Sequence, residues 1–180
     1  MKTKRSTGRF WAQNYLKWIL YGLITVAVML MQSAPRFFPV IANARPTPLV
    51  LLVVCVAMLE GARVGATVAV FAGLLWDLYT FRLFGLNALL MLCIAVVVGL
   101  LVELLLRTNF LSALLLCAGG VLTHAIIEWL LSYALFLHEE TMQVLLKVYL
   151  PNALYTLLLA PFMYCLVLWV ARFMRRRMNE

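Results

Sequence analysis

The sequence is poor in charged residues. Only 12% of its 180 residues are Asp, Glu, Lys or Arg, and 66% are apolar. Soluble domains carry roughly 25% charged and 45–50% apolar residues. The apolar runs, which approach the roughly 20 residues needed to cross a bilayer, account for nearly the whole length. This composition excludes an ordinary soluble domain and predicts an integral membrane protein.

Catalytic and metal-binding motifs are also lacking. No nucleophile stands beside a plausible base, and no loop has the spacing of a P-loop. The four cysteines lie inside apolar runs, without the short mutual spacings of zinc sites or disulfide frameworks. Charges inside the runs are few, whereas pumps and channels usually carry several. We expect no enzymatic activity, no cofactor and no metal, and a protein that works through contacts.

Charges and turn residues divide the apolar sequence into six runs. Helices and closed barrels are the structures that satisfy their backbone in lipid, and these runs lack the alternation of barrel strands. The first run is longer than the core of a signal peptide, so we interpret it as an uncleaved span. We predict one all-α membrane domain, residues 1–180, with six spans at residues 17–33, 46–59, 62–79, 84–106, 110–136 and 151–171.

The basic residues predict the orientation, because positive charge concentrates on the cytoplasmic side of membrane proteins. With six spans, one side receives Lys2, Lys4, Arg5, Arg9, Lys17, Arg63, Arg107, Arg172, Arg175, Arg176 and Arg177. The other side receives Arg36, Arg45, Arg82 and Lys147. We therefore expect both termini in the cytoplasm. The net charge of +8 is then a topology signal, and nucleic-acid binding is not expected.

A ridge of small residues runs along the third predicted span. Gly61, Gly65, Ala69 and Gly73 follow one another at intervals of four, so they lie on one helical face. Small residues on such a face allow the backbones of two membrane helices to approach closely. Two alternatives stay open: packing inside the bundle, and a surface for another protein.

Asp77 continues the same ridge at the end of the span. An ionisable group within the membrane is by default a candidate for function. The structural alternative is that its carboxylate accepts hydrogen bonds from the next turn, where Gly85 suits a tight re-entry and Asn87 supplies a polar group. Arg82 is the nearest partner for Asp77 in sequence.

His124 and Glu128 are the polar pair of the fifth span. They are four residues apart and share a helical face, so together with Asp77 they form a candidate polar cluster or cation site. Two ligands at this spacing are weak evidence for a metal. A proton or substrate pathway and a hydrogen-bonded structural cluster are the other interpretations.

Several motifs together resemble one bacterial family. They are Arg45-Pro46 before an aliphatic run, Leu59-Glu60-Gly61, the ridge followed by Trp76-Asp77-Leu78, Phe84-Gly85-Leu86-Asn87-Ala88-Leu89, and Leu150-Pro151-Asn152 through Ala160-Pro161. The sequence is similar in these motifs to the rod-shape-determining protein MreD family, over residues 45–168. It departs from the family at Thr47-Pro48, where many members carry an acid.

The resemblance implies a non-enzymatic component of the inner-membrane elongation machinery. Members bind MreC, a single-span protein, and link MreB filaments with RodA and its transpeptidase partner. A homodimer within a complex with MreC is compatible with the family. The implied fold is similar to the substrate-binding subunits of energy-coupling-factor transporters. The alternative function is therefore a vitamin-binding subunit of such a transporter.

Overall fold

The computed structural model describes residues 3–34, 45–80, 84–104, 110–136 and 145–179. Over these ranges the chain forms six α-helices and one short π-helix, and no strand. The elements are α1 (Thr3–Ser33), α2 (Pro48–Glu60), α3 (Ala62–Thr80), α4 (Leu86–Leu104), α5 (Phe110–Phe136), η1 (Leu145–Tyr149) and α7 (Leu150–Asn179). The predicted all-α architecture of six helices is confirmed.

Four helical segments in the described ranges are long and apolar enough to cross a membrane. They are α3, α4, the part of α5 from Phe110 to Leu131, and the run Leu145–Met174 in η1 and α7. Lys17–Ser33 of α1 and the whole of α2 are shorter apolar helices. The chain is therefore a multi-pass membrane protein in which two shorter helices accompany the four long ones.

The first and last helices continue beyond the predicted spans. α1 starts at Thr3 and α7 ends at Asn179, whereas the charges placed those boundaries at residues 17 and 171. Lys and Arg residues mark where a membrane span ends, but both are good helix formers, so they do not end the helix itself. The aromatic segment Phe10–Trp18 lies within α1, which continues through it without a break.

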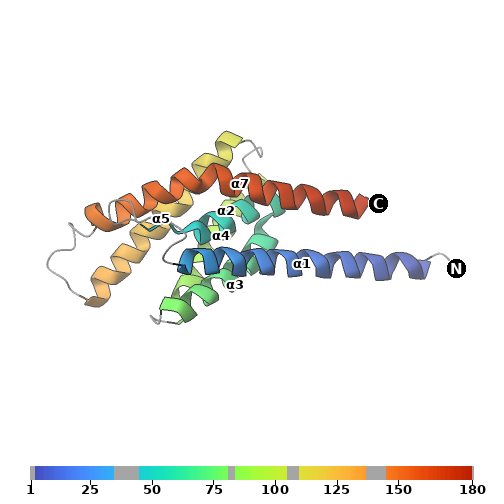
Figure 1. Cartoon of the computed structure of the whole chain (residues 1–180), viewed down its shortest axis with the longest axis horizontal. Helices are drawn as coiled ribbons and strands as arrows, with labels where there is room; N and C mark the ends of the chain where they lie inside the picture. The colour runs from blue at the N-terminus through green and yellow to red at the C-terminus, as the bar shows by residue number, and fades with distance from the viewer. Residues whose placement is uncertain (1–2, 35–44, 81–83, 105–109, 137–144, 180) are drawn as a thin grey trace.

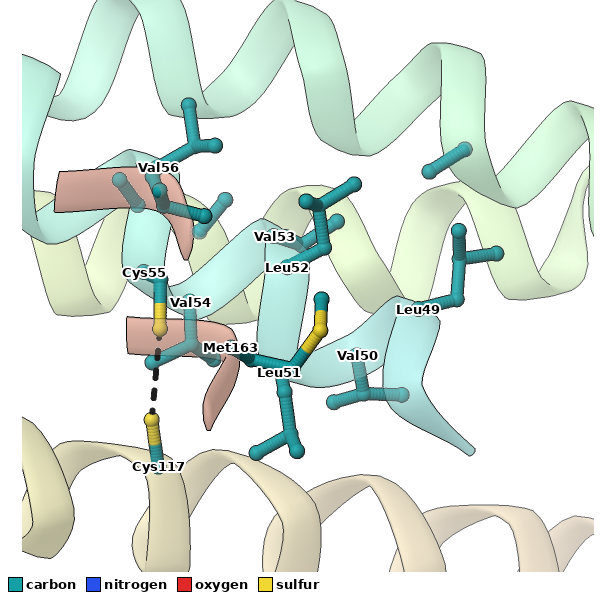
Figure 2. Packing of buried hydrophobic residues seen from close by; sticks show 14 of the residues in the cluster. Leu49, Val50, Leu51, Leu52, Val53, Val54, Cys55, Val56, Cys117 and Met163 are labelled. Atoms are coloured by element: carbon teal, nitrogen blue, oxygen red, sulfur yellow. Dashed lines mark hydrogen bonds between the residues drawn. The ribbon is translucent and has the colours of Figure 1, made fainter. Parts of the chain in front are cut away.

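The short helix α2 lies at the centre of the bundle. Every residue from Pro48 to Met58 is buried. Figure 2 shows that its side chains point in several directions, toward Met163 of α7 on one side and Cys117 of α5 on another. At 1.5 Å per residue α2 is only about 20 Å long, shorter than the hydrocarbon core. The surrounding helices shield it, so α2 can be apolar on all sides.

The helices alternate in direction, and both chain termini lie at one end of the molecule (Figure 1). We call this the terminal end, where α2 also finishes at Glu60. We call the opposite end, where α1 finishes at Ser33 and α3 at Thr80, the far end. The polar groups of interest divide between these two ends.

Candidate functional site

Asp77 holds the turn between α3 and α4. Its carboxylate is 2% exposed and lies in the last turn of α3. Oδ2 accepts hydrogen bonds from the backbone N–H groups of Gly85 at 2.9 Å and Ala88 at 3.3 Å. Oδ1 accepts from the backbone N–H of Asn87 at 3.2 Å and from its side-chain Nδ2 at 2.8 Å. The carboxylate thus satisfies N–H groups that the first turn of α4 leaves unpaired.

Gly85 gives this turn its shape. Its φ of +93° lies in the left-handed region that residues with a side chain seldom adopt. Its carbonyl accepts a hydrogen bond from Leu89 N at 2.9 Å, which begins α4. The geometry around Asp77 is the one that the structural alternative predicted. Arg82 lies outside the described residues, so its pairing with Asp77 stays a prediction.

The ridge on α3 faces the interior of the bundle. A Cβ added to Gly65 would lie 2.5 Å from the Cα and Cβ of Ala57 in α2, and one added to Gly73 would lie 2.5 Å from the backbone N of Ala88 in α4. Ala69 between them is fully buried. The ridge thus packs α3 closely against both α2 and α4. Of the two alternatives, this geometry fits packing inside the bundle.

Gly61, the first member of the ridge, joins α2 to α3 at the terminal end. Its φ of +89° again lies in the left-handed region, and its N–H donates to Ala57 O at 3.1 Å. A Cβ at this position would lie 2.9 Å from Oε1 of Glu103 in α4. The same Glu103 oxygen accepts a hydrogen bond from Ala62 N at 3.0 Å and so caps α3.

A second contact at the terminal end joins α1 to α2. Lys17 Nζ donates to Glu60 Oε2, and Tyr21 Oη donates to Glu60 Oε1 at 2.9 Å. Sequence analysis did not identify this contact, because Lys17 and Glu60 are 43 residues apart and no local spacing connects them. The sequence signal for this contact was that Glu60 ends one apolar run and Lys17 starts another.

His124 and Glu128 lie together at the far end. His124 Nδ1 is 3.8 Å from Glu128 Oε2, and the His124 ring lies 5.5 Å from that of Trp76, centroid to centroid. His124 is 3% exposed, and its Nε2 has no hydrogen-bond partner among the described residues. His124 and Glu128 therefore form the predicted pair. The pair contacts α3 through Trp76 and not through Asp77.

The candidate cation site of Asp77, His124 and Glu128 is not formed as a three-residue group among the described residues. Among the residues that the structure describes, no three His, Cys, Asp or Glu side chains lie close enough together to hold a metal ion. Asp77 is committed to the α4 turn, and His124 and Glu128 remain as two groups. The reason is packing, because α3 turns Asp77 toward α4 while Trp76 faces α5.

A cavity of about 480 Å³ opens beside this pair. The ends of α1 and α3, the middle of α5, the end of η1, the start of α7 and residues 45–47 before α2 form its wall. Arg45, Gln32 and Asn152 contribute polar side chains to the wall. Trp76, Tyr79 and Tyr149 contribute aromatic rings to it. The far end thus carries a hollow with polar and aromatic groups in its wall, of the volume that binds small molecules in other proteins.

A different surface feature lies between α4 and α5. It is a groove of about 270 Å³, lined mainly by apolar residues, which include Cys93, Val97, Leu101, Leu115, Gly119 and Thr123. Gly119 is exposed there, and a Cβ added to it would meet nothing within 4 Å. This groove is therefore open to a neighbouring molecule in the membrane.

Comparison with known proteins gives one match. The family model for the rod shape-determining protein MreD matches residues 12–177, nearly the whole chain. No curated protein matches, and no solved structure matches. The similarity to transporter subunits therefore stays a prediction. The family match includes all six helices and both ends of the bundle, and the chain belongs to the family of rod shape-determining proteins MreD.

Proposed function

We propose that this protein is a non-enzymatic scaffold in the bacterial inner membrane that binds MreC and helps to organise lateral cell-wall synthesis. The observation that carries the proposal is the family match over residues 12–177. A role in rod shape determination follows from the family. The named partner and the link to wall synthesis are our extension of it, with MreB, RodA and its transpeptidase partner as further members of the assembly.

The proposed orientation has both termini in the cytoplasm. The termini lie at the same end of the bundle (Figure 1), which supports an even number of crossings. The predicted cytoplasmic basic residues include Arg63, at the start of α3, and Arg172, near the end of α7, and both are exposed. In this orientation the far end, with its cavity, faces the periplasm.

The groove between α4 and α5 is the proposed contact for the single span of MreC. Its lining runs from Leu90 to Leu101 on α4, about three helical turns, which suits a helix better than a point contact. Gly119 lets a second backbone approach closely, which is how membrane helices associate without a hydrophobic driving force. The ridge of α3 then acts indirectly, because it fixes the positions of α2 and α4.

Co-purification tests the proposed function. MreC and this protein would be co-expressed, and one of them would be captured from detergent extract. The control is a chimera that keeps the periplasmic domain of MreC but carries an unrelated membrane span. We expect recovery of MreC with its own span and loss of the chimera. Equal recovery of both would exclude the span as the contact, and recovery of neither would contradict MreC binding.

The alternative, a vitamin-binding transporter subunit, has less support because the matched family is one of shape determination. The far-end cavity is the feature of the described residues that favours ligand binding. A ligand there does not require transport.

A further inference from the structure

We propose that the far-end cavity binds a small zwitterionic group, with an anionic pole at Arg45 and an amine pole at Glu128 and His124. This site is additional to the proposed MreC contact and does not depend on it, since the groove between α4 and α5 lies on other residues.

The first argument is the charge of the cavity wall. Among the described residues of the wall, one basic side chain of fixed charge, Arg45, and one acidic side chain, Glu128, face the cavity. The carboxylate of Glu128 would repel a dianion in this cavity, and the guanidinium of Arg45 would repel a simple cation. A molecule that carries one charge of each sign pairs with both groups, and charge-assisted hydrogen bonds of this kind are the strong ones.

The second argument is the unpaired nitrogen of His124. The Nδ1 of this ring faces Glu128 Oε2 at 3.8 Å, which favours a proton on Nδ1. Nε2 is then an acceptor, and it has no partner among the described residues although the side chain is almost fully buried. Buried polar atoms in native proteins nearly always have a partner. His124 lines the cavity, and an amine N–H of a bound molecule is our proposed donor for this nitrogen.

The third argument is the aromatic wall. Trp76, whose ring packs against that of His124, lines the same cavity as Tyr79 and Tyr149. Aromatic faces attract ammonium groups, most strongly where water is excluded. The amine pole thus meets a carboxylate, an acceptor nitrogen and aromatic rings in one place. The cavity volume of about 480 Å³ leaves room for a group of several heavy atoms.

Two sources supply this chemistry at the membrane surface: the phosphoethanolamine headgroup of a lipid, and a free zwitterion in solution. Thermal unfolding of the purified protein in maltoside detergent separates them. The probes are short-chain phosphatidylethanolamine, free phosphoethanolamine, ethanolamine alone and short-chain phosphatidylglycerol, which is anionic without an amine.

We expect the zwitterionic probe to raise Tm by about 5 °C at a concentration one hundred times its Kd. Ethanolamine and phosphatidylglycerol should have little effect. A shift with phosphoethanolamine assigns the site to a soluble ligand, and a shift with the diacyl probe alone assigns it to a lipid headgroup. Both outcomes support the proposed chemistry.

Two variants connect the shift to the cavity. Arg45→Gln and Glu128→Gln should each abolish it, whereas Arg63→Gln, which removes an exposed charge at the terminal end, should preserve it. Arg45 is exposed, so its variant is expected to fold even if Glu128→Gln does not. The proposal is overturned if no zwitterionic probe shifts Tm, if phosphatidylglycerol does so equally, or if the shift survives Arg45→Gln.

Discussion

Gly65 and Gly73 in α3 and Gly119 in α5 occupy opposite environments. Gly65 and Gly73 lie against the backbones of neighbouring helices, where no Cβ fits. A Cβ added to Gly119 meets nothing within 4 Å. One added to its neighbour Gly120 would lie 2.7 Å from Cγ2 of Val54 in α2. The same residue type therefore joins helices inside the bundle in one region and leaves a surface open in the other.

Polar groups show the same contrast. In the α3–α4 turn Asp77 accepts four hydrogen bonds within 3.3 Å. Near the middle of α5, His124 keeps an unpaired nitrogen beside a cavity. The α2–α3–α4 region is built for stability, with close backbone contacts and a fully hydrogen-bonded Asp77 carboxylate. The α5 region carries the open groove and the open cavity. We propose that MreC binds at the groove and a zwitterionic group in the cavity.

The largest expected loss of stability comes from a substitution that disrupts the close packing of α3 against α4. Gly73→Ala should destabilise the protein by about 3 kcal/mol or more, because the added methyl overlaps the backbone of Ala88, which cannot rotate away. Gly119→Ala is the matched control, and it should be neutral or slightly stabilising because alanine favours helix. Thermal unfolding in detergent measures both. Equal Tm changes in the two variants would remove the distinction between the regions.

The next effect concerns the Asp77 turn. Asp77→Leu should cost about 3 kcal/mol, because buried N–H groups of α4 then lack acceptors. Asp77→Asn keeps one acceptor oxygen, and its amide can donate to Asn87 Oδ1, which has no partner among the described residues. A loss of about 1 kcal/mol is expected for it. Equal loss with Asn and Leu in unfolding measurements would favour a role for the charge itself.

A smaller effect is expected at the terminal end. Glu60→Gln and Lys17→Met would be measured singly and together, so that the double-mutant cycle isolates their interaction. We expect a coupling of about 1 kcal/mol, since the pair is partly buried and joins α1 to α2. Additive effects would show that the Lys17–Glu60 ion pair does not help to hold α1 against α2.

The sequence predicts the helices well because their boundaries depend on local signals. Proline at the start of α2, the glycines at positions 61 and 85, and the spacing of charges mark the turns between apolar runs. α1 and α7 continue beyond the predicted spans, since Lys and Arg are good helix formers and do not end a helix.

The site is predictable only in part. The i,i+4 spacing identified His124 with Glu128 and placed Asp77 on the ridge, because one helix fixes both relations. Whether Asp77 joins His124 depends on how α3 rotates against α4 and α5, which no local pattern determines. The contact of Glu60 with Lys17 and the cap that Glu103 gives to Ala62 depend on helix packing in the same way.

Two open glycines offer the most direct test of the account. Gly119 and Gly22 both lie in apolar helices, and a Cβ at either position meets nothing within 4 Å. Gly22 is on α1, away from the groove. MreC would be co-purified with the Gly119→Leu and Gly22→Leu variants, with Tm as the check on folding. We predict that Gly119→Leu reduces the MreC recovered by about tenfold, because leucine fills the groove, and that Gly22→Leu leaves it unchanged. Undiminished recovery with folded Gly119→Leu would contradict the account.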